Sequence, residues 1–414
     1  MKKLLVIGYV WPEPKSSAAG SHMMSLIRLF AKNQWQVTFA TPAQSTDYNH
    51  DLTTEGIEVQ TISINDSTFD SFVSQLNPTA VLYDRFMMEE QFGWRVAEAV
   101  PTALQILDTE DLQCLRNARH NALKEDREFS FNDLNSELAR REIASIYRCD
   151  LSLIISDFEI ELLQNHFSLD PQLLIRIPFM LDLGKLKEDA LAYSERNHFI
   201  TIGNLRHAPN WDSVLYLQKI WPLIRRHLPQ AELHIYGAYT PPKATALNSP
   251  SNGFLIKDRA DDVDQVMKHA RVCLSPLRFG AGIKGKFIDA MRMKTPIVTT
   301  DIGAEGMTFG QPWPGFVANS PEEIANSAID LYQNQATWEA KQKLCHPLLI
   351  ESYDAAKIGK TLLERVESLL TDIDAHRSKN FIGGMLKHHS MRSTKFMSKW
   401  IEEKNRQSAR DIAK

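Results

Sequence analysis

Short apolar runs alternate with amphipathic segments along most of the chain, and this alternation predicts a fold of repeated strands and helices. In the first half, strands are expected at 4–8, 37–40, 57–64, 80–83, 102–107, 151–156 and 175–178. Helices are expected at 21–32 and 89–99, and over most of 115–149. Strands that are apolar throughout are typical of a parallel sheet covered on both faces.

The second half repeats this alternation without a detectable sequence repeat. Strands are expected at 198–202, 232–236, 253–256, 272–275 and 296–300, and helices at 210–228, 263–269, 284–293, 321–332 and 335–348. Pro222 is expected to kink the first of these helices. The pattern predicts an α/β protein of two doubly wound domains that face each other across a cleft.

The expected limits are 1–184 for the first domain, 185–196 for a polar linker, 197–350 for the second domain and 351–375 for a closing helix. The tail, 376–414, has ten Lys or Arg against three Asp or Glu, with apolar residues at partly helical spacing. Gly383 and Gly384 are expected to interrupt its helix. Such a segment can lie on an anionic membrane surface, or it can be a helix packed on the domains or a loosely ordered tail.

Length and composition narrow the class of protein. A chain of 414 residues exceeds one ordinary core, and 43% hydrophobic with 24% charged residues is typical of a soluble globular protein. A net charge of −4 gives no argument for nucleic acid as a partner. The four cysteines lack metal-site spacing, which favours a reducing compartment and no zinc. The opening apolar run is too short for a signal peptide or a membrane span, so a cytoplasmic location is expected.

Residues 271–307 carry the strongest chemical signal. They predict a strand, a glycine loop, a helix and a second strand, an arrangement that directs backbone N–H groups and the positive end of a helix dipole at an anion. Glycines at 280, 282 and 285 allow a ligand to approach the backbone, and Lys284 and Lys286 add positive charge. The stretch therefore predicts a site for a phosphorylated small molecule.

The same glycines spell G-x-G-x-x-G, and Asp301 follows at the end of the next strand, as in dinucleotide-binding folds. Against a dehydrogenase, the motif does not open its domain and carries lysines where backbone amides usually suffice. Asp289, inside the expected helix, can also face the cleft and accept hydroxyl hydrogen bonds. The dehydrogenase is kept as a weaker alternative.

Two further positions lie beyond strand ends, where open α/β sheets bind ligands. The first strand–helix loop ends at Gly20, where a helix N-terminus could meet an anion or where the loop is only a flexible connection. Asp108 and Asp111 follow another strand and are acceptor-side candidates, with helix capping as the competing role.

Segments of the second half, GNLRHAPNWDSVLYLQKIWPLIRRHLPQAELHIYG, ARVCLSPLRFGAGIKGKFIDAM and PIVTTDIGAEGM, resemble the donor-binding domain of the GT-B glycosyltransferases of family 4, within a subgroup that carries GAGIKGK. The first strand–helix loop, LDTEDLQCLRNAR and DLSLIISDFEIELL resemble the acceptor-side domain of that family. The resemblance covers roughly residues 1–370. It implies a retaining, hexosyl-type transfer from a nucleoside-diphosphate-sugar, with UDP or GDP expected, to a glycan or lipid-linked acceptor, with no metal or other cofactor.

The resemblance also assigns roles around the leaving diphosphate. Lys284, Lys286 and Arg206 are the expected positive charges, with the backbone amides of 282–284, including Ile283, beside them. Asp289 is expected to accept from the ribose hydroxyls. Gly203, at the start of the second domain's first loop, and Glu305 are expected donor contacts, a turn-forming acid being the alternative for Glu305.

Several positions depart from the family pattern. Ala281 replaces the first of two acids and Asp289 shortens the second, while Asn204 and Pro209 replace a usual Arg and Lys. The loop in which the family often carries a histidine offers acids instead, namely Asp108, Glu110 and Asp111, followed by Gln113. The leading hypothesis is a glycosyltransferase of polysaccharide biosynthesis. A non-catalytic sugar-nucleotide-binding or assembly module, and less so a dehydrogenase or a GT-B epimerase, remain as alternatives.

Overall fold

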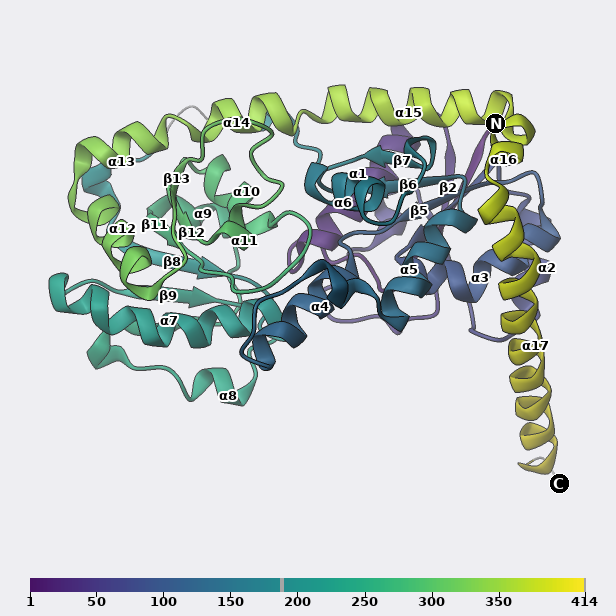
Figure 1. Ribbon diagram of the computed structural model, residues 1–414, viewed down its shortest axis with the longest axis horizontal. Helices are drawn as coiled ribbons and strands as arrows, with labels where there is room; N and C mark the ends of the chain where they lie inside the picture. Colours follow the sequence, from purple (N-terminus) through teal and green to yellow (C-terminus); the bar gives the residue numbers. More distant parts are fainter. Residues whose placement is uncertain (187–189, 413–414) are drawn as a thin grey trace.

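The computed structural model describes residues 1–186 and 190–412 and shows two α/β domains side by side (Figure 1). In the described part of the first domain, seven parallel strands form one sheet in the order β3-β2-β1-β4-β5-β6-β7. These strands are β1 (Lys3–Ile7), β2 (Gln36–Thr41), β3 (Glu58–Thr61), β4 (Ala80–Asp84), β5 (Leu104–Asp108), β6 (Leu151–Ile154) and β7 (Leu174–Arg176). Its helices are α1 (Ala18–Lys32), α2 (Thr68–Leu76), α3 (Phe86–Ala99), α4 (Gln113–Lys124), α5 (Glu137–Arg148) and α6 (Asp157–Asn165).

The second domain, over the residues described, has a six-stranded parallel sheet in the order β10-β9-β8-β11-β12-β13. Its strands are β8 (His198–Ile202), β9 (Leu233–Tyr236), β10 (Phe254–Ile256), β11 (Ala270–Leu274), β12 (Ile297–Thr299) and β13 (Gly315–Val317). Its helices are α7 (Ala208–His227), α8 (Pro242–Thr245), α9 (Val263–His269), α10 (Gly285–Arg292), α11 (Asp301–Ala304), α12 (Pro321–Gln333), α13 (Gln335–Gln342) and α14 (Cys345–Ser352).

Both sheets start at an inner strand, β1 or β8, and grow outward first on one side and then on the other. This doubly wound order confirms the predicted fold class. It leaves a switch point beside β1 and another beside β8, at the carboxyl ends of the strands, where such sheets bind ligands.

After the second domain the chain returns to the first. Helix α15 (Ala355–Thr371) runs along the upper edge of Figure 1 and is followed by α16 (Ile373–Lys379) and α17 (Phe381–Ile412). Leu362, Val366 and Leu369 of α15 are buried in one core with the β1 residues Leu4 and Val6. Helix α15 therefore completes the apolar cover on one face of the first sheet.

The two passages between the domains are joined to each other. Leu181 and Asp354 form a parallel β-bridge. The Leu181 N–H donates to the Tyr353 carbonyl at 2.8 Å, and the Ala355 N–H donates to the Leu181 carbonyl at 2.9 Å. The two passages thus lie side by side. The predicted linker, 185–196, includes 187–189, which lie outside the described residues.

Three local expectations need correction. Gly383 and Gly384 do not interrupt the tail helix, because they fall in the first turn of α17, where a Cβ on Gly383 would lie 2.2 Å from the Tyr147 carbonyl oxygen. The helix expected at 335–348 is two helices, α13 and α14. Strand β13 was missed because it has three residues in a stretch rich in proline and glycine.

Candidate functional site

The loop from β11 to α10 meets the first domain closely. Gly282 has a φ of 62°, in the left-handed region that favours glycine. A Cβ at Gly282 would lie 2.9 Å from the Asp111 Cβ, and one at Gly285 would lie 2.5 Å from the Ala18 Cβ. A Cβ at Gly280 would meet no atom closer than 3.8 Å. Two of the three motif glycines are therefore required by the approach of the facing domain.

The Gly282 amide already has a carboxyl group as its partner. Its N–H donates to Glu159 Oε1 at 2.9 Å, and the same oxygen accepts from the Leu112 N–H at 2.9 Å. Glu159 is fully buried at the start of α6, and burial raises its pKa to about 8. A carboxyl group of the first domain thus occupies one loop amide that the sequence predicts for phosphate.

Both predicted lysines lie at the N-terminus of α10. Lys284 is buried, and its ammonium donates to the Gly282 carbonyl at 2.7 Å. Lys286 donates to Asn210 Oδ1 at 2.8 Å and to Ser275 Oγ at 3.2 Å. Burial lowers the pKa of each lysine to about 8. Acids nearby balance the charges of these two lysines only in part, and both lysines lie at the positive end of a helix dipole. Together they make a site for an anion.

Glu305 lies just after α11 and has a partner in the other domain. Arg119 of α4 donates to both of its carboxylate oxygens at 2.7 Å and to the Gly280 carbonyl at 2.9 Å. The sequence did not predict this pair. Glu305 therefore has an interdomain partner in Arg119, and the predicted contact of Glu305 with the donor would have to form alongside this ion pair.

Asp289 lies on α10, one turn beyond the lysines. Arg292 approaches its Oδ1 at 3.5 Å, and about a third of the Asp289 side chain (34%) is exposed. Burial raises its pKa, to about 6, while Arg292 opposes the rise, so the carboxylate is ionised at neutral pH. It remains available to accept hydroxyl hydrogen bonds.

Gly203 and Arg206 lie between β8 and α7. A Cβ at Gly203 would lie 2.6 Å from the Asn210 Nδ2, so this glycine leaves room for the side chain that holds Lys286. Arg206 is exposed and its guanidinium lies 4.4 Å from the centre of the Tyr239 ring. Tyr239 in turn donates to the Glu13 carboxylate at 2.9 Å, which ties this loop to the first domain.

Gly20 lies inside α1 rather than before it, because the helix begins at Ala18, three residues earlier than expected. Its N–H donates to the Ser17 side chain, the N-cap, at 3.0 Å. The Gly20 amide is therefore already used in capping the helix.

Of the two acceptor-side candidates, Asp108 belongs to a buried polar cluster at the carboxyl ends of β4 and β5. Asp108 is buried beside His22 of α1, with 3.6 Å between Asp108 Oδ1 and His22 Nε2. Asp84 and Glu110 are buried in the same cluster. Among the described residues, both His22 ring nitrogens, Asp84 Oδ1 and Asp108 Oδ2 have no hydrogen-bond partner. His22 Nε2 and Asp84 Oδ1 nevertheless lie within ion-pair distance of Asp108 and Arg85. Asp111 instead pairs with Arg116, at the Gly282 loop.

Sequence reasoning missed His22. The acceptor-side histidine was sought in the loop after β5, whereas His22 reaches the same strand end from α1. Its place on the inner face of an expected helix, two residues after Gly20, was the available signal. The opposing charges set its state. Burial disfavours its charged form, but Asp108, Glu110 and Asp84 outweigh burial and raise the His22 pKa to about 9.

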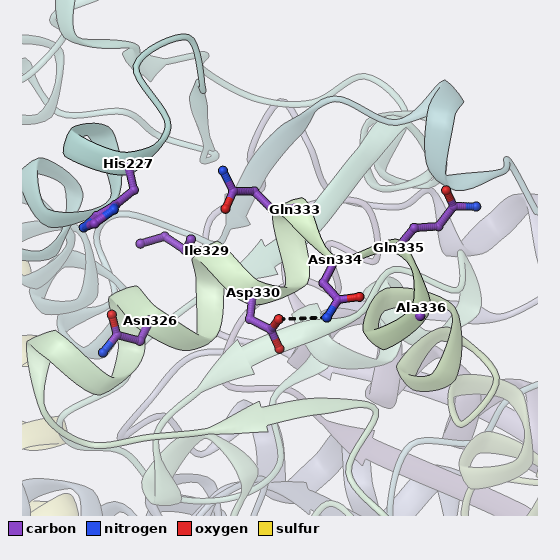
Figure 2. A pocket seen from close by; sticks show the side chains of 8 residues that line it. All are labelled: His227, Asn326, Ile329, Asp330, Gln333, Asn334, Gln335 and Ala336. Atoms are coloured by element: carbon purple, nitrogen blue, oxygen red, sulfur yellow. Dashed lines mark hydrogen bonds between the residues drawn. The ribbon is translucent and has the colours of Figure 1, made fainter.

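A surface hollow of about 650 Å³ lies elsewhere, between the end of α7 and helices α12 and α13 (Figure 2). Its lining is His227, Asn326, Ile329, Asp330, Gln333, Asn334, Gln335 and Ala336. Because α7 has 20 residues, its two ends are about 30 Å apart, so the hollow is remote from the lysines near the start of α7. We do not assign the chemistry to it.

Within residues 1–186 and 190–412, no three His, Cys, Asp or Glu side chains are grouped so that they could hold a metal ion. Over the same residues, no helix combines the length and apolar character that crossing a membrane requires.

Comparison with known proteins bears on both sequence and fold. Residues 196–334 match the family described as Glycosyl transferases group 1. A curated relative, an uncharacterized 44.6 kDa protein in the cps region of Klebsiella pneumoniae, is 25% identical over 171 residues. That match spans 39% of this chain and 44% of the relative, less than half of its length.

Solved structures resemble the whole fold at low identity. A mutant of S. aureus TarM, in complex with fondaparinux, alpha-GlcNAc-glycerol and UDP, has a TM-score of 0.68 at 10% identity and covers 88% of this chain and 100% of its own. Sucrose-phosphate synthase from Thermosynechococcus elongatus has a TM-score of 0.69 at 13% identity, covering 90% and 100%. The pneumococcal O-GlcNAc transferase GtfA, with UDP and GlcNAc, has a TM-score of 0.67 at 13% identity, covering 90% and 99%. Residues 196–334 therefore resemble a Glycosyl transferases group 1 domain, within a chain that has the two-domain fold of these glycosyltransferase structures.

Proposed function

We propose that the protein transfers a hexosyl group from a nucleoside-diphosphate-sugar to a glycan or lipid-linked acceptor. The observation that carries the proposal is the placement of Lys284 and Lys286 at the N-terminus of α10, inside the segment that matches the transferase family. The UDP held by TarM and GtfA in their crystal structures supports a uridine or similar nucleotide here.

In this proposal the chain's own charges serve the leaving group. Negative charge grows on the β-phosphate as the glycosidic bond breaks, and preorganised positive charge stabilises that change more than it stabilises the ground state. Lys284 and Lys286 supply the charge, and the Ile283 backbone and the first amides of α10 add N–H groups. Asp289 accepts from the ribose hydroxyls, and the transfer proceeds with retention and without a metal.

In this proposal the β11–α10 loop loses some of its contacts with the first domain when the donor diphosphate binds. Glu159 holds the Gly282 amide and Arg119 holds Glu305, so a diphosphate competes with a carboxyl group at the first position. We assign UDP or GDP as the donor nucleotide and polysaccharide biosynthesis as the setting. The proposed location is cytoplasmic, with contact between the tail, 376–414, and a membrane that carries the acceptor.

One observation favours a second candidate, a non-catalytic sugar-nucleotide-binding module. Ala281 lacks the acid that family members place near the donor sugar, and the Gly282 amide is already engaged by Glu159. Binding of a sugar nucleotide without transfer or hydrolysis would favour this candidate over the enzyme.

Thermal-shift binding to UDP, GDP, ADP, CMP, TDP and NAD(P)H, with and without EDTA, tests the proposal. A ligand at a hundred times its Kd stabilises the fold by about 2.7 kcal/mol, which is readable as a rise in Tm. We expect a rise with UDP or GDP that survives EDTA. A rise only with NAD(P)H would replace the transferase with the dehydrogenase, and a rise that EDTA abolishes would contradict metal-free binding.

The lysines give a sharper test. Lys284→Ala and Lys286→Ala should each lower turnover about 10²- to 10³-fold, since loss of one preorganised donor to a developing charge has an effect of this size. Lys219→Ala, an exposed lysine on α7 of the same domain, is the matched control and should retain full turnover. Wild-type turnover in the Lys284→Ala/Lys286→Ala double variant would rule the mechanism out.

A further inference from the structure

Helix α17 packs on the first domain through its polar side. Ser398 Oγ donates to Asn65 Oδ1 at 2.7 Å and accepts from Arg95 at 3.1 Å. Lys395 pairs with Glu98 of α3, and Glu402 accepts from the Ser67 N–H at 3.2 Å. A helix that packs on a globular domain normally turns its apolar face inward. The inner contacts of α17 are hydrogen bonds and ion pairs instead.

Its apolar side chains face outward. Six of them are between 44% and 80% exposed: Phe381, Ile382, Met385, Phe396, Met397 and Trp400. At 100° per residue they occupy one stripe roughly 160° wide, on the side opposite Ser398 and Glu402. We call these six residues the outer face of α17. Figure 1 shows the last turns of the helix, in yellow, extending past the body of the domain.

The charge beside the outer face is basic. Arg392 and Lys399 are exposed on the same side, and the Lys404 ammonium lies 5.4 Å from the centre of the Trp400 ring. The tail, 376–414, has ten Lys or Arg against three Asp or Glu, although the whole chain has a net charge of −4. The bases that border the outer face are therefore Arg392, Lys399 and Lys404, against one exposed acid within the stripe, Glu403. Arg377 and Lys395 of the tail instead pair with Asp150 and Glu98 of the first domain.

We propose that the outer face of α17 docks on an anionic lipid surface, with Phe396, Met397 and Trp400 entering the headgroup region and the flanking basic residues binding lipid phosphates. Helices with a bulky apolar stripe and a basic border lie in the plane of a membrane interface. Trp is enriched at that depth, because its ring is amphipathic. The stripe is wider than the two-in-seven seam of a coiled coil, which argues against a second copy of α17 as the occupant. The inference develops the membrane contact of the proposed function and does not depend on transfer activity.

Vesicle sedimentation of the full chain tests the docking. Wild-type protein should sediment with phosphatidylcholine vesicles that contain about 30 mol% phosphatidylglycerol, and hardly at all with phosphatidylcholine alone, because each basic residue near an anionic surface contributes about 1 kcal/mol, or about fivefold. Raising the salt concentration should weaken binding, since the attraction is screened. Equal sedimentation with both vesicles, or none with either, would overturn the proposal.

Two double variants separate the outer face from general stickiness. Phe396→Ser/Trp400→Ser should lower vesicle affinity at least tenfold. The control, Ile350→Ser/Phe131→Ser, removes two side chains that are each 52% exposed on other elements and should bind as the wild type does. Equal losses in both variants would contradict a specific face. Arg392→Gln/Lys399→Gln should lower affinity about 25-fold on anionic vesicles only, fivefold for each charge.

Two further readouts keep the outcomes distinct. Sedimentation equilibrium without lipid should give a monomer, and a dimer that Phe396→Ser/Trp400→Ser dissociates would assign the outer face to a second copy instead. The UDP-induced rise in Tm should be the same in the wild type and in this variant. If the protein binds vesicles but no nucleotide raises its Tm, the docking stands and the proposed transferase fails. If a nucleotide raises the Tm but the protein does not bind vesicles, the transferase stands and the docking fails.

Discussion

The His22 cluster joins charge and burial at the strand ends of the first domain. His22 is buried with Asp108, Asp84 and Glu110, and over the part of the chain that the structure describes four polar atoms of the cluster lack a hydrogen-bond partner. The acids raise the His22 pKa to about 9, and burial together with Asp108 raises the Glu110 pKa to about 8. At neutral pH the folded state therefore keeps protons that the unfolded chain would release.

Because His22 and Glu110 hold protons in the folded state that the unfolded chain would release, stability is predicted to depend on pH. His22 has a folded pKa above its unfolded value of 6.5, so its contribution is complete below pH 6.5 and is lost as the pH rises towards 9. The free energy of unfolding should fall by up to about 1.4 kcal/mol per pH unit in this window from His22 alone. Chemical denaturation at pH 6.5, 7.5 and 8.5 measures the slope.

The variant His22→Gln removes the proton that His22 binds and also the charge that lowers the Glu110 pKa, so it reports on these two coupled groups, while Glu159 remains in place. Its slope should be shallower than that of the wild type between pH 7 and 9. His120→Gln is the control, since His120 is on α4 and stacks on Phe279, 4.2 Å between ring centres, with a lowered pKa whose main cause is burial. Equal slopes in wild type and His22→Gln would show that His22 is not held protonated.

For single residues, the sequence predicted which residues lie at the site better than it predicted which side chains they contact. The lysines and Asp289 lie on the loop and helix to which the glycine pattern assigned them. Arg119, Glu159 and His22 could not be found in the same way, because each reaches the site from an element far away in the chain. The contacts of Arg119 and Glu159 depend on how the two domains are oriented, and that of His22 depends on how α1 packs on the first sheet, neither of which local spacing encodes.

Among the elements, the β11–α10 connection is constrained by the facing domain. Gly282 combines a left-handed backbone with contact to Asp111, whereas Gly280 has space around it. The glycine motif therefore has two positions, Gly282 and Gly285, where a side chain is excluded, and one, Gly280, where it is tolerated.

Gly282→Ala should lower the free energy of unfolding by about 1–2 kcal/mol from the left-handed backbone alone, and further from the contact with Asp111. Gly280→Ala should stay within about 0.5 kcal/mol of the wild type. Urea denaturation of both variants measures the difference. Equal stabilities would mean that the loop moves away from Asp111 at little cost.

Element types were largely predictable, because buried parallel strands and amphipathic helices have distinct periods. The strand at His198–Ile202 and the helix at Val263–His269 begin and end where the pattern placed them. Errors fell where tertiary contacts decide. Gly383 was expected to break a helix on intrinsic preference, but it is needed for close packing on Tyr147.

For the molecule as a whole, the two domains are held in contact across the strand ends. Arg119 binds Glu305 and the Gly280 carbonyl, and Tyr239 binds Glu13. The Arg119–Glu305 pair is mostly buried, at 7% and 15% exposure of the two side chains. Such a pair is costly to break from one side, by about 3–5 kcal/mol, because a charge is left without compensation.

Arg119→Gln should therefore shift the protein towards a more open arrangement of the domains. Small-angle X-ray scattering should show a larger radius of gyration for this variant, and Arg119→Gln/Glu305→Gln should lie between it and the wild type. Arg127→Gln, which alters an exposed arginine just after α4 with partners in its own domain, should leave the radius unchanged. An unchanged radius for Arg119→Gln would place the closing energy in other contacts.

The β-bridge between Leu181 and Asp354 determines what kind of opening this can be. Two separated connections would restrict the rotation of one domain relative to the other. Here the two connections are hydrogen-bonded to each other at one edge of the molecule. The two joined passages can therefore act as one hinge, about which the second domain rotates relative to the first. In Figure 1 the crossing lies along the upper edge and α4, with Arg119, lies below. The Arg119–Glu305 pair is thus an attachment between the domains in addition to the crossing, and breaking it leaves the crossing free to act as the hinge.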